Sequence, residues 1–317
     1  LMKYDQDDFN RYEASQTLSK YFILDQYSNG AVDDLKLDSD YMDSFIYLLN
    51  DSTIENSFKA QCMQVPSENI LYQDLDIIDV EKIYNIRKKF ILMRTLSSFD
   101  QIQEIYNELN VPEDYSLYIN AQGRRSLKNT CLALLCATEK EQAYDLCFKQ
   151  YTNANNMTDE FSSFYHLVQT NNKYSLGVIS SFYNKWKSDT LVIQKWLSAQ
   201  SSGSEGDCIN RIKELEQSDV YDKLVPNLVR ALIGPFLRNA VNFHAKDGSG
   251  YKFIREKIIE IDSVNPQIAA GLSKGFNLYQ KINTENKNMM KRELEVILAT
   301  PNLSRNVTEI ISNTLNK

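Results

Sequence analysis

The sequence predicts an all-α protein, an irregular α-solenoid in which successive antiparallel helices stack in the manner of HEAT or armadillo arrays. Its 317 residues include 10 glycines and 6 prolines, about half the usual share of these turn-forming residues. Apolar residues recur at helical spacing, and alternating patterns of strand length are nearly absent. Because no strict 34- or 40-residue period is present, the predicted solenoid is irregular.

The pattern near the N-terminus predicts a long helix. Its apolar residues, at helical spacing, are Ala14, Leu18, Tyr21 and Phe22. The pair Asn29-Gly30 ends this helix, because both residues favour the position after a last helical turn. Further along, Ser97 or Ser98 divides the region 79–110 into two helices.

Start signals mark later helices. Thr138 and Glu141 form a capping box, in which a hydroxyl and a carboxylate each satisfy a free backbone N–H. Asn265-Pro266 combines an N-cap residue with a proline at the first helical position. Apolar stripes near the C-terminus consist of Met290, Leu294, Ile297 and Leu298, and of Val307, Ile310, Ile311 and Leu315. The expectation is fifteen or more helices, most of them about 8–20 residues long.

Composition limits the kinds of partner. A chain of this length forms one elongated domain or two compact ones, and we assign residues 1–317 to one helical domain. The net charge of -7 and the pI near 5.1 argue against a nucleic-acid partner, which requires clustered Lys and Arg. No apolar run approaches the ~20 residues of a membrane span, so no membrane partner is expected.

Cysteine usage indicates the compartment. The five scattered cysteines are Cys62, Cys131, Cys136, Cys147 and Cys208. Their odd number and the absence of C-x-x-C predict free, mostly buried thiols in a reducing, cytoplasmic setting. The chain starts at Leu1 without an initiator Met or a signal peptide, and we therefore expect it to be a piece of a longer polypeptide.

The sequence predicts no catalytic residue, cofactor or metal ligand in this chain. His166 and His244 are its two histidines, and neither lies in H-E-x-x-H, whereas a catalytic zinc requires three converging ligands. A structural, hydrogen-bonded His166 is the expectation. The run Asp247-Gly248-Ser249-Gly250 lacks the phosphate-loop pattern, and a glycine-rich connection between helices explains it better.

One charged residue interrupts an apolar helix that begins at Pro226. On a helical wheel Arg230 shares a narrow polar strip with Asn227 and Gly234. The arginine either packs its stem and solvates its head, or faces a cavity where it meets a carboxylate. The residues alone leave these two alternatives open.

Six segments in order resemble motifs of the C-terminal helical domain of bacterial-type aminopeptidase N, a gluzincin zinc metallopeptidase family also known as alanyl aminopeptidase. The motifs resemble D-F-x-R-[WY]-[DE]-A-x-Q, N-N-M-T-D, K-W…L-V…K-W, R-x-L-I-G-x-F, F-H-A-x-D-G-S-G-Y and N-P-Q-[VI]-A. They lie at residues 8–16, 155–159, 185–196, 230–236, 243–251 and 265–269. The region 30–120 matches more weakly. Their common order makes the resemblance specific over nearly the whole chain.

The resemblance implies a parent enzyme whose other domains are absent here. These are an N-terminal β-domain, a thermolysin-like domain that binds zinc through H-E-x-x-H and a distal Glu, and a small β-domain. A G-x-M-E-N loop would hold the free amine of the substrate. The parent would remove single N-terminal residues from peptides with zinc-activated water. In such enzymes the helical domain covers the zinc site and admits short peptides, so the expected partners are the other domains and peptide substrates.

The resemblance also implies two substrate-binding residues. Gln267 matches a position that borders the pocket for the first side chain of the peptide, although a glutamine near a helix terminus also bonds locally without any such role. Arg230 matches a cavity-lining arginine. A second cavity arginine of some members falls at Gly271, so a two-arginine carboxylate clamp is in doubt in this chain. The family's N-P before the Arg230 helix is replaced by Val225-Pro226.

Two function classes therefore stand beside each other. The first is a non-catalytic, substrate-enclosing domain of a zinc aminopeptidase. The alternative is a free-standing α-solenoid that binds protein partners on its concave face. The length of the full coding sequence, and H-E-x-x-H upstream of this chain, would separate the two.

Overall fold

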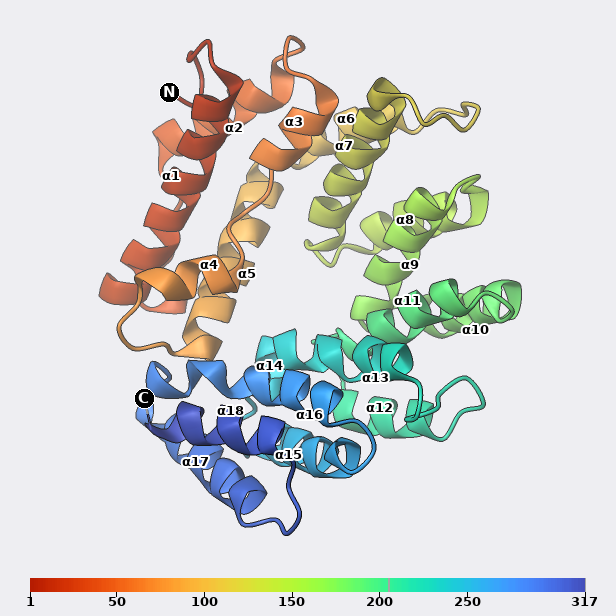
Figure 1. The fold of residues 1–317 in the computed structure, drawn as a ribbon. Coiled ribbons are helices and arrows are strands. Elements are labelled where there is room, and N and C mark those ends of the chain that lie inside the picture. Colours follow the sequence, from red (N-terminus) through yellow and green to blue (C-terminus); the bar gives the residue numbers. More distant parts are fainter. Residues whose placement is uncertain (205, 317) are drawn as a thin grey trace. The chain divides into compact units, whose positions relative to one another are not determined.

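A computed structural model describes residues 1–204 and 206–316 (Figure 1). Helices make up 73% of the chain, and the described residues contain no β-strand. The all-α prediction is therefore confirmed. The polar loop at 201–206 contains Glu205, which lies outside the described residues.

The chain forms two compact units. The first comprises Leu1–Asp74 and Lys82–Leu167, and the second comprises Leu75–Glu81 together with the chain from Val168 onward. Each unit has its own apolar core.

The first unit is built around α7. Its elements are α1 (Asp8–Asn29), η1 (Val32–Asp34), α2 (Ser39–Asn50), α3 (Asn56–Cys62), α4 (Glu68–Leu71), η2 (Tyr72–Asp74), α5 (Val80–Ser97), α6 (Phe99–Leu109), α7 (Ile119–Cys136), α8 (Glu141–Asn153) and α9 (Met157–Gln169). Helices α3, α6 and α8 pack against α7 (Figure 1). Phe45, Phe90 and Leu132 are fully buried in the core of this unit.

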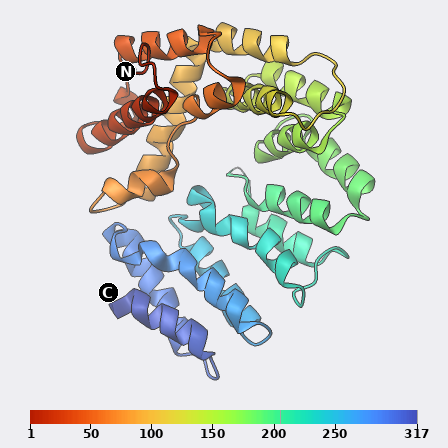
Figure 2. The ribbon, with the colours of Figure 1, turned by 45° about the horizontal axis from the view of Figure 1, so that its top comes forward.

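The second unit continues the succession of helices. Its elements are α10 (Ser175–Trp186), α11 (Thr190–Ser201), α12 (Cys208–Glu216), α13 (Pro226–Leu232), η3 (Gly234–Arg238), α14 (Ala240–Phe243), α15 (Ser249–Asp262), α16 (Pro266–Ser273), η4 (Lys274–Gln280), α17 (Thr284–Leu298) and α18 (Arg305–Asn316). Helices α15 to α18 lie side by side (Figure 2). Contacts between helices close in sequence are typical of a solenoid.

The segment before α5 is part of the second unit, although it is far from the rest of that unit in sequence. The backbone N–H of Ile78 donates to the carbonyl of Lys281 at 2.7 Å, and that of Asn283 donates to the carbonyl of Ile78 at 2.9 Å. The ammonium of Lys246 lies 2.9 Å from a carboxylate oxygen of Glu81. These bonds join residues 75–81 to the connection between η4 and α17.

The buried face of α1 differs from the predicted one. Arg11, Ser15, Ser19 and Ile23 are buried on this helix, whereas Tyr21 is 60% exposed. The small serines face inward because their hydroxyls donate to helix carbonyls one turn earlier, at Tyr12 and Ser15. Of the predicted apolar stripe, Ala14, Leu18 and Phe22 are half-buried and Tyr21 is exposed. The predicted helix is present and ends at Asn29 as expected.

The predicted helix boundaries are largely confirmed. Ser98 separates α5 from α6, and the Asn265 side chain caps α16 by accepting from the N–H of Ile268. The capping box at Thr138 and Glu141 is wrong. Helix α8 begins at Glu141 with no side-chain cap, because the Thr138 hydroxyl donates instead to the carbonyl of Leu135.

In the described residues, no helix combines the length and the apolar character that a bilayer span requires. All five cysteines are buried and free, as predicted. Burial raises the pKa of the Cys62 thiol to about 11 and that of Cys131 to about 12. Thiols with such pKa values are poor nucleophiles, which is consistent with a structural role.

Candidate functional site

Arg230 lies on the exposed side of α13. The helix buries Leu228, Val229 and Leu232, and the hydroxyl of Ser198 on α11 donates to its backbone at Ala231. The guanidinium Nη1 of Arg230 donates to Oδ1 of Asn227 at 3.2 Å. Within the part of the chain that the structure describes, Arg230 makes no ion pair. An exposed, unneutralised guanidinium on a short rigid helix is suited to binding a carboxylate.

Gln267 occupies the first turn of α16, where its side chain is exposed. Helices α13 and α16 pack against each other, so Arg230 and Gln267 lie on neighbouring elements of one unit. Gly271 lies one helical turn after Gln267 and is exposed on the same helix. A Cβ at Gly271 would meet no atom within 4 Å, so this position has room for a side chain. That Arg230 and Gln267 face one cavity stays a prediction.

The motif around His244 has a structural explanation. The Tyr251 hydroxyl accepts from Nδ2 of Asn286 at 2.8 Å and lies 2.8 Å from Nδ1 of His244, which joins α15 to α17 and the end of α14. When Nδ1 of the neutral His244 ring carries no proton, the Tyr251 hydroxyl donates to it. Burial lowers the pKa of His244 to about 4. His244 is therefore a neutral, hydrogen-bonded structural residue.

The two glycines of the same motif have different backbone requirements. Gly248 has φ of 73°, a left-handed conformation that favours glycine, at the start of α15. At Gly250 a Cβ would collide with the backbone carbonyls of Asn242 and Phe243. The run is a tight connection between α14 and α15, as predicted, and its glycines serve close packing.

The two histidines lie on different elements. His166 lies on α9 in the first unit, and His244 directly follows α14 in the second unit. His166 on α9 packs edge-on against the ring of Tyr165 at a centroid distance of 5.6 Å. Burial lowers the pKa of His166 to about 4, so the imidazole is neutral. Among the described residues, no group of three or more His, Cys, Asp or Glu side chains is arranged to hold a metal ion.

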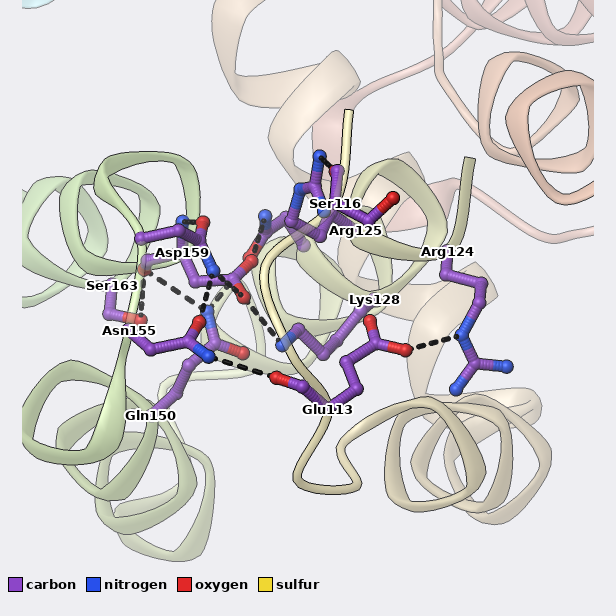
Figure 3. A network of polar contacts seen from close by, with 11 residues as sticks. Glu113, Ser116, Arg124, Arg125, Lys128, Gln150, Asn155, Asp159 and Ser163 are labelled. Atoms are coloured by element: carbon purple, nitrogen blue, oxygen red, sulfur yellow. Dashed lines mark hydrogen bonds and ion pairs between the residues drawn. The ribbon is translucent and has the colours of Figure 1, made fainter. Parts of the chain in front are cut away.

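The N-N-M-T-D segment forms a buried polar network centred on Asp159, called here the Asp159 network (Figure 3). Its carboxylate accepts from Lys128 Nζ at 2.7 Å, from Asn129 Nδ2 at 2.9 Å and from Asn156 Nδ2 at 3.0 Å. Gln150 Nε2 donates to Asn129 Oδ1 at 2.8 Å and to the Asp159 carbonyl at 3.2 Å. The network joins α7, α8 and α9, so this segment has a structural function.

A cavity of about 740 Å³ lies in the first unit among α5, α7, α9 and the loops at 63–65 and 115–117. Three of its lining residues are arginines: Arg87, Arg94 and Arg125. The sequence did not predict this cavity. The one sequence feature that points to the cavity is Arg94. This charged residue directly follows the apolar run 90–93, where a charged side chain is not expected.

Comparison with known proteins identifies the fold family. A family model described as a domain of unknown function with ARM repeats (DUF3458_C) matches residues 1–316. The chain belongs to this family. The ARM-repeat description confirms the predicted α-solenoid.

Relatives of this DUF3458_C chain are larger proteins named aminopeptidase N. The one from Caulobacter vibrioides is 30% identical over 312 residues, which are 98% of this chain and 36% of that protein. The one from Escherichia coli is 30% identical over 319 residues, covering 99% of this chain and 36% of that protein. The chain thus spans a little over a third of their length. The predicted resemblance to the C-terminal domain of aminopeptidase N is confirmed.

A solved structure shows the same fold. It is the crystal structure of Legionella pneumophila aminopeptidase A in complex with aspartic acid, with a TM-score of 0.89 and 24% sequence identity. The match covers 99% of this chain and 37% of that one. This likeness establishes the arrangement of the helices.

Proposed function

We propose that this chain is the non-catalytic C-terminal domain of a zinc aminopeptidase, where it covers the active-site chamber and lines the substrate cavity. The parent enzyme removes N-terminal amino acids from peptides. The main support for the proposal is that nearly the whole chain matches proteins named aminopeptidase N. The chain spans 36% of the length of each of them. The remaining two thirds of such a protein has room for the zinc ligands and the β-domains.

The proposal assigns the chemistry to the other domains. The zinc of the parent would activate the water that attacks the peptide bond. This chain would contribute size selection and contacts to the peptide. Its partners are accordingly the other domains of the same polypeptide and peptide substrates. The five free, buried thiols support a cytoplasmic location.

Within this function we propose that Arg230 binds the C-terminal carboxylate of the peptide and that Gln267 borders its first side chain. Support comes from the exposed Arg230 guanidinium, which makes no ion pair among the described residues, and from the contact between α13 and α16. A charge-assisted hydrogen bond of this kind contributes about 1–3 kcal/mol. A side-chain pocket discriminates by a similar amount of about 1–3 kcal/mol.

The test uses the full-length parent enzyme with Arg230→Ala. We expect kcat/KM for a short peptide with a free C-terminal carboxylate to fall about tenfold or more. The same peptide as a C-terminal amide should be hydrolysed as before. Arg292→Ala, a change at an exposed arginine on α17, is the control and should affect neither substrate. An equal loss for the acid and the amide would contradict the role of Arg230.

The alternative of a free-standing scaffold has less support. The relatives described above are enzymes about three times the length of this chain, and they share one name. A full coding sequence without H-E-x-x-H upstream of this chain would favour the scaffold and refute the aminopeptidase proposal.

A further inference from the structure

The arginine cavity of the first unit contains more positive charge than its surroundings neutralise. We define it by Arg87, Arg94, Arg125, Gln122, Asn129 and Thr130 among its lining residues. Among the described residues that line it, none is Asp or Glu. Such a concentration of arginine stands out in a protein whose net charge is -7.

Arg94 provides a buried charge at this cavity. The residue is 1% exposed, and its guanidinium lies 4.3 Å from the centre of the Phe45 ring. Nη1 donates to the Tyr41 hydroxyl at 3.3 Å and Nη2 donates to the carbonyl of Met63, which are both neutral acceptors. Its Nε has no hydrogen-bond partner among the described residues. A buried cation without a carboxylate imposes a positive potential on the space next to it.

Arg125 is held in place by neutral groups as well. Its Nη2 donates to the carbonyl of Ser116 at 2.8 Å (Figure 3). Its guanidinium lies 5.0 Å from the centre of the Tyr115 ring. Because a guanidinium has five N–H donors, further donors remain for a ligand. The Glu113 carboxylate lies 3.4 Å from Arg124. Among the described residues Arg125 forms no ion pair.

Two other cations near the cavity are already paired. Arg87 forms an ion pair with Glu68 at 3.2 Å, and Lys128 forms one with Asp159 at 2.7 Å. Arg94 and Arg125 are therefore the two cavity arginines that no carboxylate neutralises among the described residues. An anion entering the cavity would supply the missing negative charge.

The remaining lining indicates what kind of anion fits. Apolar side chains such as Ile91 and Leu134 line the cavity together with neutral amides and hydroxyls such as Gln122, Thr130 and Ser162. Peptide side chains match the apolar groups, and peptide N–H and C=O groups match the amides and hydroxyls. The volume of about 740 Å³ is within the usual range of ligand sites, about 300–1,000 Å³.

We propose that the arginine cavity of the first unit binds a carboxylate of a short peptide, either its C-terminus or an acidic side chain. Arg125 is the residue that contacts the carboxylate, and Arg94 acts on it through the electric field. This site is separate from Arg230, which belongs to the second unit. The proposal goes beyond the proposed function, since binding here requires no catalytic domain.

The experiment measures binding to the 317-residue chain by calorimetry. The probes are acetyl-Ala-Ala-Ala with a free C-terminus, its C-terminal amide, and acetyl-Ala-Glu-Ala amide. We expect at least one of the two carboxylate-bearing peptides to bind about tenfold or more tightly than the neutral amide. The tighter of the two identifies which carboxylate the cavity accepts. Acetylation blocks the free amine that an aminopeptidase needs, so binding of these peptides does not depend on catalysis. The Arg125→Gln variant separates this site from Arg230.

Variants on α7 provide the matched comparison. Arg125→Gln should weaken binding of the carboxylate peptide about tenfold, whereas Arg124→Gln, at the next residue and paired with Glu113, should leave it unchanged. Ser126→Glu changes an exposed lining residue and should abolish binding, because it places a carboxylate at the cavity without removing an arginine. Circular dichroism spectra check that each variant is folded.

Several results would overturn the proposal. They are equal binding of all three peptides, no binding of any peptide, equal losses in the Arg124 and Arg125 variants, and full binding by the Ser126 variant. Displacement of the peptides by inorganic phosphate at equal or lower concentration would also overturn it, since the cavity would then be a phosphate site.

Discussion

Replacing Asp159 with alanine should destabilise the first unit more than any surface substitution. The carboxylate of Asp159 and the ammonium of Lys128 lie 2.7 Å apart, with side-chain exposures of 6% and 11%. Asp159→Ala leaves the Lys128 charge buried without a partner, and it also removes the acceptor used by Asn129 and Asn156. Breaking a buried pair in this way lowers the free energy of unfolding by about 3–5 kcal/mol.

A double-mutant cycle separates the ion pair from simple loss of packing. The cycle consists of Asp159→Leu, Lys128→Met and the variant that combines them. Lys128→Met alone leaves Asp159 with two amide donors, and the double variant replaces the pair by apolar groups of similar size. Because such replacement of a buried pair is often neutral or stabilising, the double variant should be more stable than Asp159→Ala. The coupling energy should lie at about 0.5–3 kcal/mol, the range for residues in direct contact.

The assay is urea unfolding followed by circular dichroism, with the midpoint and slope compared among variants. Glu295→Ala is the control, since Glu295 and Lys291 form an ion pair at 3.8 Å in which both side chains are more than half exposed. Glu295→Ala should change the free energy of unfolding by no more than about 1 kcal/mol. The predicted role of the buried pair would be refuted if Asp159→Ala lowered the free energy of unfolding by less than about 1 kcal/mol, or if the effects in the cycle were additive.

Two further predictions concern glycine positions and histidine titration. Gly271→Ala should raise the free energy of unfolding by about 0.5–1 kcal/mol, because alanine has the higher helix propensity and the added Cβ meets open space. Gly250→Ala should lower the free energy of unfolding, because its Cβ would collide with backbone carbonyls. The urea midpoints of both variants check these two predictions. The pKa of His244 is lowered to about 4, so the unfolded chain takes up the proton first, and stability should fall as pH drops from about 6.5 to 4. His244 contributes at most about 1.4 kcal/mol per pH unit to the slope of unfolding free energy against pH. The slope should therefore be shallower in His244→Gln. An unchanged slope would contradict the lowered pKa of His244.

The sequence predicts local features of this fold well. The start of α13 at Pro226, the cap of α16 at Asn265 and the break at Ser98 depend on backbone groups within a few residues, so local sequence determines them. The serine-lined buried face of α1 was not predictable in the same way. The Ser19 hydroxyl lies 3.1 Å from that of Tyr41 on α2, and this contact depends on how the two helices pack.

The candidate sites show the same distinction. Arg230 and Gln267 were proposed from a resemblance, and the structure describes both as exposed residues on contacting helices. The arginine cavity was not predictable, because Arg94 and Arg125 lie on α5 and α7 and the cavity also involves α9. Whether a carboxylate neutralises these arginines depends on the distances between the helices. The periodicity of the sequence does not give those distances.

The most direct test compares zinc content and hydrolysis of an alanyl-arylamide by the isolated chain and by the full-length protein. The account predicts that the 317-residue chain binds no stoichiometric zinc and releases no arylamine. The full-length protein should bind zinc and lose its activity with a chelator. Stoichiometric zinc in the isolated chain, together with chelator-sensitive turnover, would contradict the assignment of this chain as a non-catalytic domain.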